Sequence, residues 1–243
     1  MSPVIAGIAA TLLAGTVQGL AGFGFALVGV PLLVLVLPPT TVMPVLLIHA
    51  IFMNGCIAWE ARMHLRFRRI APLLVAGVIG LPFGGLTLHF VSAALLKSII
   101  GCLVILFATA QLSGFRRPVA NEKAALWPVG FISGLLNGST TMGGPPIILF
   151  LSNQGVEKHV FRANLVFYFM VLNIGTLPVF YLSGLISTST LALSLRTAPG
   201  TIIGALLGIL LSKYAPERLF RTAVLLIVLG AGILALLAGA GVI

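Results

Sequence analysis

The sequence contains very few charged residues, and one acidic residue type is missing from it. Only 7% of the 243 residues are charged, aspartate is absent, and the only acidic residues are Glu60, Glu122, Glu157 and Glu217. Paired carboxylates for hydrolysis, and carboxylate ligands for magnesium or calcium, are therefore not available in the usual patterns. We expect no cofactor, no metal site and no enzymatic activity.

Cysteine is also rare, since Cys56 and Cys102 are the only two in the chain. Both lie inside apolar segments, where a free cysteine behaves as a small apolar side chain. We expect both side chains to be buried, and we expect neither a redox pair nor a metal site.

Apolar residues, in contrast, dominate the chain. They make up 59% of the sequence, and the mean hydropathy is +1.19. A soluble fold would lack polar surface at this composition, so we predict an all-α, polytopic membrane protein whose partner is the lipid bilayer. Because a spanning helix takes about 20 residues, the chain has room for one transmembrane domain, residues 1–243, and little else.

Apolar segments separated by polar residues, glycine or proline fall into two series of five. The first series covers 4–21, 25–37, 41–59, 70–90 and 92–113, and the second covers 124–138, 145–152, 160–183, 189–212 and 216–240. In each series the last three segments are long enough to span, and the first two are shorter and separated by a glycine-rich break. This pattern predicts a pair of short broken or re-entrant helices followed by three spanning helices in each half.

The basic residues lie in short clusters between the segments, so the net charge of +10 indicates membrane topology rather than nucleic-acid binding. The clusters are Arg62, Arg66, Arg68 and Arg69; Arg116, Arg117 and Lys123; Lys158 and Arg162; and Lys213, Arg218 and Arg221. The segment count places all of them on one side, which is the cytoplasmic side by the positive-inside rule. The protein is then expected in the inner membrane of a cell, with both termini on the extracytoplasmic side.

An internal repeat supports this topology. A shift of 119 residues superposes Gly15, Gln18, Gly19, Gly24 and Asn54 on Gly134, Asn137, Gly138, Gly143 and Asn173, and a shift of 124 superposes Gly80 and Gly84 on Gly204 and Gly208. Five segments per half is an odd number, so the two repeats, 1–113 and 124–243 with a linker at 114–123, are expected to be inverted. We expect the Gly80/Gly84 and Gly204/Gly208 faces to pack within the chain.

The two breaks are the strongest candidates for a binding site. The first contains Gln18, Gly22, Phe23 and Gly24, and the second contains Asn137, Ser139, Thr140, Thr141, Gly143 and Gly144. Glycine permits unwound backbone there, and amides at the start of the next helix attract an anion. The alternative is that these positions are kinks whose hydroxyls bind freed carbonyl groups.

Other polar residues within the apolar segments are further candidates. His49 could carry a coupled proton or be a hydrogen-bonded core histidine, and Arg196 could attract an anion or extend to the membrane surface. Asn54 and Asn173 could line the same site or bond between helices. Because no carboxylate lies mid-segment, the usual acidic proton and sodium relays are missing.

The motifs resemble the TauE/SafE family of sulfite and organosulfonate exporters, also called the toluenesulfonate uptake permease family. The resemblance rests on Gly19-Leu20-Ala21-Gly22-Phe23-Gly24 followed by Pro31, on the stretch Gly134 to Pro145, and on Phe161-Arg162-Ala163-Asn164. Phe23 and Phe25 interrupt the consecutive glycines common in the family's first motif, which narrows that half of the site. The resemblance implies transport of sulfur-containing oxyanions such as sulfite or sulfoacetate.

We therefore predict a secondary transporter that moves a small sulfonate or sulfite anion, outward, by alternating access. A passive anion channel, an importer of the same anions and an intramembrane enzyme built on His49 are the alternatives that the sequence leaves open. Monomer and homodimer are both compatible with it, and protons are a candidate coupling ion.

Overall fold

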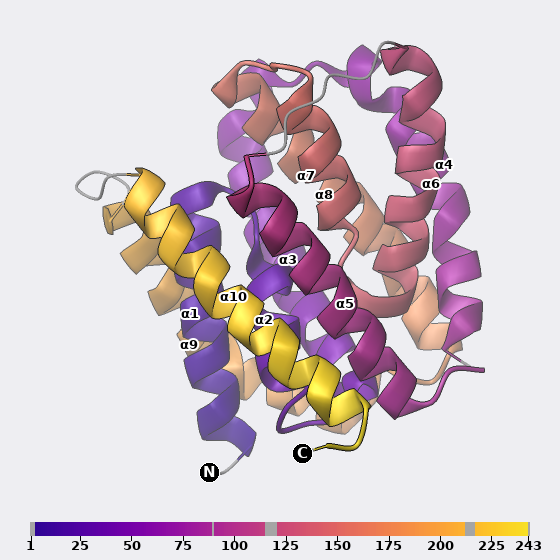
Figure 1. The fold of residues 1–243 in the computed structure, drawn as a ribbon, viewed down its shortest axis with the longest axis vertical. Helices are drawn as coiled ribbons and strands as arrows, with labels where there is room; N and C mark the ends of the chain where they lie inside the picture. Colours follow the sequence, from indigo (N-terminus) through magenta and orange to yellow (C-terminus); the bar gives the residue numbers. More distant parts are fainter. Residues whose placement is uncertain (1–2, 89, 115–120, 212–216, 243) are drawn as a thin grey trace. The chain divides into compact units, whose positions relative to one another are not determined.

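The computed structural model describes residues 3–88, 90–114, 121–211 and 217–242, and these residues are mainly helical (Figure 1). The helices are α1 (Pro3–Ala21), α2 (Phe25–Leu33), α3 (Pro39–Ala61), α4 (Phe67–Thr87), α5 (Ala93–Leu112), α6 (Glu122–Thr140), α7 (Gly144–Asn153), α8 (Lys158–Leu182), α9 (Thr188–Leu211) and α10 (Glu217–Gly239). A short 3-10 turn, η1 (Arg62–His64), connects α3 to α4. The prediction of an all-α fold with five segments in each half is confirmed.

Among the described residues, six helices are long and apolar enough to cross a membrane. One of them is α1, whose candidate span Val4–Ala21 has the bounds predicted for the first segment and is long enough to cross a membrane. The helix reaches this length because neither a charged residue nor a proline interrupts it after Pro3, up to the glycines of the first break. The second segment ends earlier than expected, at Leu33, because turns follow in place of its last four residues.

Both breaks are present in the structure. After α1, Gly22 and Gly24 have positive φ angles of 80° and 107°, and α2 then runs for only nine residues. After α6, Thr141 has a φ of 57°, and α7 runs for ten residues. The left-handed backbone at Gly22 and at Thr141 reverses the chain direction locally and ends the first helix of each half.

The chain forms two compact units, and each unit combines segments from both halves of the sequence. Unit 1 contains Met1–His49, Val91–Phe115 and Leu185–Ile243, and unit 2 contains Ala50–Phe90 and Arg116–Gly184. The prediction of two repeats at 1–113 and 124–243 concerns a different division of the chain, and it stays a prediction.

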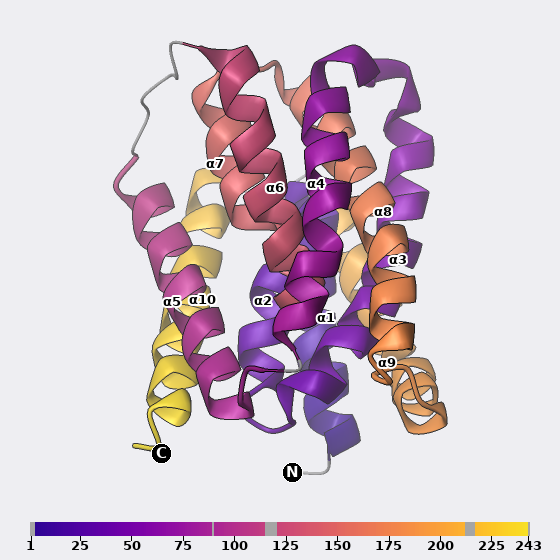
Figure 2. The same ribbon diagram turned by 90° about the vertical axis from the view of Figure 1, so that its right-hand side faces the viewer.

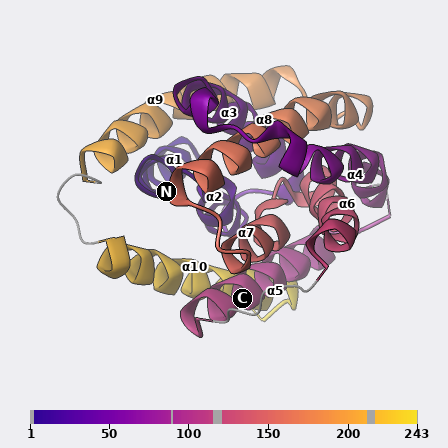
Figure 3. The ribbon, with the colours of Figure 1, turned by 90° about the horizontal axis from the view of Figure 1, so that it is seen from above.

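In unit 1, α1 packs along α9, and α5 packs along α10 (Figure 3). A Cβ added to Gly15 would lie only 2.7 Å from the carbonyl oxygen of Thr201. The backbones of α1 and α9 therefore approach closely where glycine has no side chain to separate them. Helices α5 and α10 are antiparallel, because Gly101 lies beside Leu236 and Ser98 lies beside Gly239. The start of α1 and the end of α10 lie at the same end of the unit (Figures 1 and 2).

In unit 2, α4 and α6 form an equally close pair (Figure 2), with α8 packed against α4. A Cβ on Gly134 would collide with the carbonyl oxygen of Gly77, and a Cβ on Gly80 would collide with that of Phe131. The Gly80/Gly84 face therefore packs against α6, while the Gly204/Gly208 face packs against α1. Both faces pack within the chain, as predicted.

The glycine contacts of the two helix pairs correspond one to one under the shifts of 119 and 124 residues. Gly15 with Thr201 corresponds to Gly134 with Gly77, Gly19 with Ala205 to Gly138 with Leu81, Gly204 with Leu12 to Gly80 with Phe131, and Gly208 with Thr16 to Gly84 with Leu135. In both pairs, the first helix of one half packs in parallel against the fourth helix of the other half. The repeat in the sequence is thus also a repeat of backbone contacts.

The basic residues that the structure describes in unit 2 gather at one end. Arg69 binds Glu122 at 2.8 Å, and Arg162 lies 3.7 Å from Glu60, which brings together the starts of α4, α6 and α8 and the end of α3. This agrees with clusters that share one side of a membrane. Arg116, Arg117 and Lys213 lie outside the described residues, as do the side chains of Lys158, Arg218 and Arg221.

The expectation for the two cysteines was wrong, since Cys56 and Cys102 are both exposed. Each lies on an outward face of its helix, where a bilayer would supply the apolar surroundings that a soluble protein finds only in its core. An apolar segment therefore did not imply a buried position.

Candidate functional site

The first break, in unit 1, is held by a buried carboxamide. The Oε1 atom of Gln18 accepts the backbone N–H of Phe25 at 3.0 Å, and the Gln18 side chain is buried. Gln18 therefore ties the last turn of α1 to the first residue of α2. The amides of Ala26 and Leu27 come next, and as early residues of a helix they have no intrahelical acceptor.

His49 lies next to this break, in the part of α3 that belongs to unit 1. Its ring stacks on Phe25 with 6.1 Å between ring centroids. Its Nε2 atom is 3.1 Å from the hydroxyl oxygen of Thr197, and its Nδ1 atom is 2.8 Å from that of Thr201. Gln18, Phe25, His49 and the two threonines form one buried cluster built from α1, α2, α3 and α9.

The hydrogen-bond distances are compatible with a neutral His49 ring in this cluster. The Thr197 hydroxyl lies 2.9 Å from the carbonyl oxygen of Leu193, to which it can donate while it accepts a hydrogen bond from Nε2. Nδ1 of a neutral ring then accepts the hydroxyl hydrogen of Thr201. Both alternatives for His49, a core histidine and a proton carrier, stay predictions.

The second break, in unit 2, is held by Asn137. Its Nδ2 group donates to Oδ1 of Asn173 at 3.1 Å and to the hydroxyl of Thr176 at 2.9 Å, and its Oδ1 atom accepts the N–H of Gly143 at 3.3 Å. Ser133 donates to the carbonyl oxygen of Gly143 at 2.6 Å. Asn137 and Gln18 are equivalent in the repeat, and each accepts a backbone N–H from a residue at or next to the start of the following short helix, Gly143 before α7 and Phe25 in α2.

The hydroxyls of the second break bind backbone carbonyl groups. Ser139 donates to Leu135 at 2.9 Å, Thr140 to Leu136 at 2.7 Å, and Thr141 to Thr140 at 2.6 Å. Of these three acceptors, the carbonyl oxygen of Thr140 belongs to the last turn of α6, which lacks intrahelical donors, whereas those of Leu135 and Leu136 lie one turn earlier.

The two breaks differ in the amides that they leave free. The positions equivalent to Ala26 and Leu27 are Pro145 and Pro146 in the second half, and proline has no N–H. The start of α7 therefore offers fewer donors than the start of α2. The expectation of bare amides fits the first break better than the second.

The remaining predicted residues differ in their surroundings. Asn54 is buried in the part of α3 that belongs to unit 2, whereas Arg196 is exposed on α9. The four glutamate residues lie at helix ends in the chain: Glu60 near the end of α3, Glu122 at the start of α6, Glu157 before α8 and Glu217 at the start of α10. The mid-helix sections carry amides, hydroxyls and His49 instead.

Comparison with protein-family models gives a match to the sulfite exporter TauE/SafE family over residues 7–235, nearly the whole chain. The chain belongs to this family. Family membership indicates a multi-pass membrane protein that exports sulfite or a related sulfur-containing anion, and it indicates a transporter rather than an enzyme. Neither the curated proteins nor the solved structures contain a significant match to it.

The structure of this TauE/SafE family member brings together Gln18 and His49 in unit 1, and Asn137, Asn173 and Gly143 in unit 2. Sequence reasoning missed their partners Thr176, Thr197 and Thr201. Thr197 and Thr201 are four residues apart in α9, and Thr176 is three residues after Asn173 in α8. That spacing places polar side chains on one face of an apolar helix, which is a signal that the sequence does contain.

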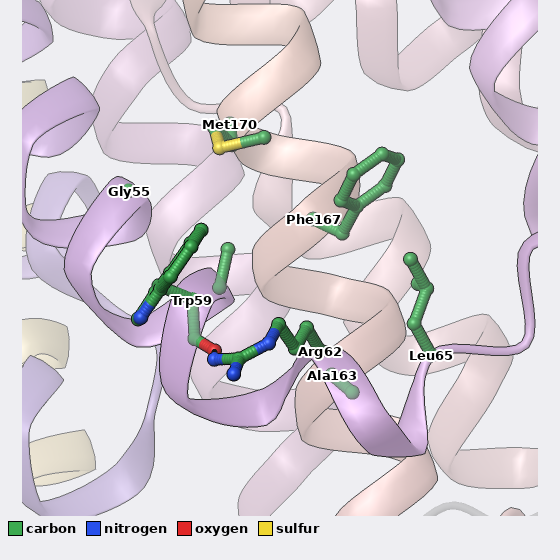
Figure 4. A pocket seen from close by; sticks show the side chains of 8 residues that line it. Gly55, Trp59, Arg62, Leu65, Ala163, Phe167 and Met170 are labelled. Carbon is green, nitrogen blue, oxygen red and sulfur yellow. Dashed lines mark hydrogen bonds between the residues drawn. The ribbon is translucent and has the colours of Figure 1, made fainter.

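A separate hollow of about 210 Å³ lies in unit 2 between the end of α3 and α8 (Figure 4). Its lining is apolar except for Arg62, whose guanidinium lies 4.5 Å from the centre of the Trp59 ring and donates to the Trp59 carbonyl oxygen at 2.6 Å. Because that cation is already held by Trp59, the hollow is not the candidate anion site.

Proposed function

We propose that this family member exports sulfite or a small organosulfonate across the cytoplasmic membrane by alternating access. In this proposal, residues of each break take part in substrate binding. The first break binds the anion with the amides of Ala26 and Leu27, beside the cluster of Gln18, Phe25 and His49. The second break supplies neutral polar groups around Asn137 and Thr141.

The observation that carries this proposal is the first turn of α2. Its amides point out of a helix start, where the helix dipole favours negative charge, and the nearby polar side chains are uncharged. An uncharged site binds an oxyanion through donated hydrogen bonds and releases it more readily than a site with a fixed cation. Reversible binding of that kind is what a carrier needs.

Inverted repeats are part of the proposal. Halves of opposite sense require their equivalent helices to run in opposite directions, and the two fifth helices, α5 and α10, are antiparallel within unit 1. The exchange of fourth helices between the halves, α9 onto α1 and α4 onto α6, also gives both halves the same local packing. Such repeats are the usual basis of alternating access in secondary transporters.

The membrane potential drives export in this proposal. With the cell interior negative, outward movement of an anion is favoured by about 2.3 kcal/mol per charge per 100 mV. The neutral hydrogen bonding of His49 fits a structural role, so we assign no coupled proton to it. Export then depends on the charge of the substrate alone.

Flux in proteoliposomes tests this function. Radiolabelled sulfite and sulfoacetate would be loaded into vesicles that contain the purified parent protein or the variants Gly143→Leu and Thr141→Val. We expect saturable flux in the parent, increased by a potential that is negative inside, and a loss of at least tenfold in Gly143→Leu, whose side chain would displace Asn137 and Ser133. The matched control is Thr109→Val, on the exposed side of α5.

Three outcomes would contradict the proposal. Unchanged flux of both anions in Gly143→Leu and Thr141→Val would remove the second break from the site. Flux that rises linearly with concentration and shows no stimulation by anion on the opposite side would indicate a passive channel. Flux that occurs only inward would identify an importer with the same site.

A further inference from the structure

A larger hollow, of about 690 Å³, lies in unit 2 at the starts of α4 and α6, away from both breaks. Its lining includes the basic residues Arg68 and Lys123 in the first turns of α4 and α6, called the rim below, and the apolar residues Pro72, Leu126 and Trp127 further along these helices, called the floor. It combines cations with apolar surface at the basic end of the unit, and the transport site does not use it.

The charges of this hollow are unequally engaged. Arg69 binds Glu122 through two nitrogen atoms, Nε at 2.9 Å and Nη2 at 2.8 Å, so these two residues neutralise each other. Arg68 and Lys123 are exposed, and no carboxylate among the described residues pairs with either. Within the part of the chain that the structure describes, the hollow therefore presents two positive charges without a carboxylate partner.

The polarity of the hollow follows the axis of α6. Lys123 lies in the first turn and Trp127 four residues later, which is about 6 Å deeper at 1.5 Å per residue. Trp127 is half exposed, while Leu126 beside it is buried. A cationic rim above an apolar floor with an accessible indole matches the level at which lipid headgroups meet acyl chains.

We propose that this hollow binds one anionic phospholipid. Its phosphate lies between Arg68 and Lys123, and the part of an acyl chain nearest the headgroup lies against Pro72, Leu126 and Trp127. Basic pockets between membrane helices on the cytoplasmic side bind anionic headgroups by this combination of charge and apolar contact. A soluble oxyanion would use the two cations but leave the apolar floor and the exposed indole without a partner. The volume also far exceeds that of a small oxyanion.

Quenching of Trp127 fluorescence by brominated lipids tests the site directly. The variant Trp59→Phe leaves Trp127 as the single tryptophan, and the purified full chain would be reconstituted in phosphatidylcholine vesicles with a small fraction of brominated phosphatidylglycerol or brominated phosphatidylcholine. We expect the site to bind brominated phosphatidylglycerol at least about fivefold more tightly than brominated phosphatidylcholine, because each cation near an anionic headgroup raises the affinity by about that factor. In the double variant Arg68→Gln/Lys123→Gln, the two lipids should quench equally.

The matched control is Arg66→Gln, which removes one exposed positive charge at the same end of the unit but does not line the hollow. It should keep the preference for phosphatidylglycerol. Equal quenching by both lipids in the parent, or an unchanged preference in the double variant, would overturn the proposal. Loss of the preference on addition of millimolar inorganic phosphate or sulfite would also overturn it, because the hollow would then bind a soluble anion.

Discussion

The imidazole Nδ1 of His49 lies 2.8 Å from the hydroxyl oxygen of Thr201 in unit 1. The corresponding contact in unit 2 is that of Tyr168 with Gly77. Under the shifts of 119 and 124 residues, His49 is equivalent to Tyr168 and Thr201 to Gly77. In each unit, the third helix of one half thus reaches the fourth helix of the other half through one large side chain. The two contacts share their place in the fold and differ in chemistry.

Replacing Thr201 with valine should destabilise the protein. The variant keeps the shape of the side chain but leaves the buried Nδ1 of His49 without its donor, which typically costs about 1–3 kcal/mol of unfolding free energy. Thermal unfolding in detergent would show a lower midpoint for Thr201→Val, and no change for Thr109→Val, whose hydroxyl binds its own helix on an exposed face. Equal midpoints for the two variants would show that the His49 contact has no stabilising role.

Thr141→Gly should separate backbone strain from the loss of a hydroxyl. Thr141 is β-branched and left-handed, a conformation that costs about 1–2 kcal/mol, whereas its equivalent in the first half is Gly22. Glycine relieves this strain, but its greater conformational freedom in the unfolded chain lowers the unfolding free energy by about 0.5–1 kcal/mol. We expect a midpoint within a few degrees of the parent and reduced anion flux; parental flux would exclude Thr141 from the site.

Gly134→Ala should be strongly destabilising, because its methyl group would collide with the carbonyl oxygen of Gly77 on α4. Moving the helices apart would also loosen the neighbouring contacts, so we expect a loss of at least about 2 kcal/mol, in the range of overpacked cores. Gly55→Ala is the matched control, since it is also a mid-helix glycine but has open space around its Cα. Alanine there should be neutral or stabilise by up to about 1 kcal/mol.

Asn164→Ala should weaken the entry into α4. The Oδ1 atom of Asn164 accepts the N–H of Arg66 at 2.9 Å, which ties α8 to the residue that precedes α4. Loss of this acceptor should lower the unfolding free energy by about 1–2 kcal/mol. Hydrogen exchange followed by mass spectrometry should show faster exchange in peptides that cover the first turn of α4, and parental exchange there would contradict this role.

The sequence predicts the helix boundaries and breaks well because local residues determine them. Gly22 and Gly24 end one helix and begin the next, and Gly144-Pro145-Pro146 begins another, whatever surrounds them. The equivalence of Gly15 with Gly134 was also visible. Its meaning, that each glycine packs against the fourth helix of the other half, depends on tertiary contacts that the repeat spacing does not specify.

The candidate site was predictable only in part. Gln18 and Asn137 stand out as amides beside glycine, and both hold their breaks. The partners of His49 lie 148 and 152 residues away in the chain, so no local pattern connects them. The left-handed backbone of Thr141 was equally hidden, because threonine gives no signal for that conformation.

The prolines that open α7 make the starts of the two short helices unequal as hydrogen-bond donors. Where α2 has the peptide N–H groups of Ala26 and Leu27, α7 has Pro145 and Pro146, which have none. The internal repeat is therefore nearly symmetric in its packing and asymmetric in its capacity to donate hydrogen bonds to an anion.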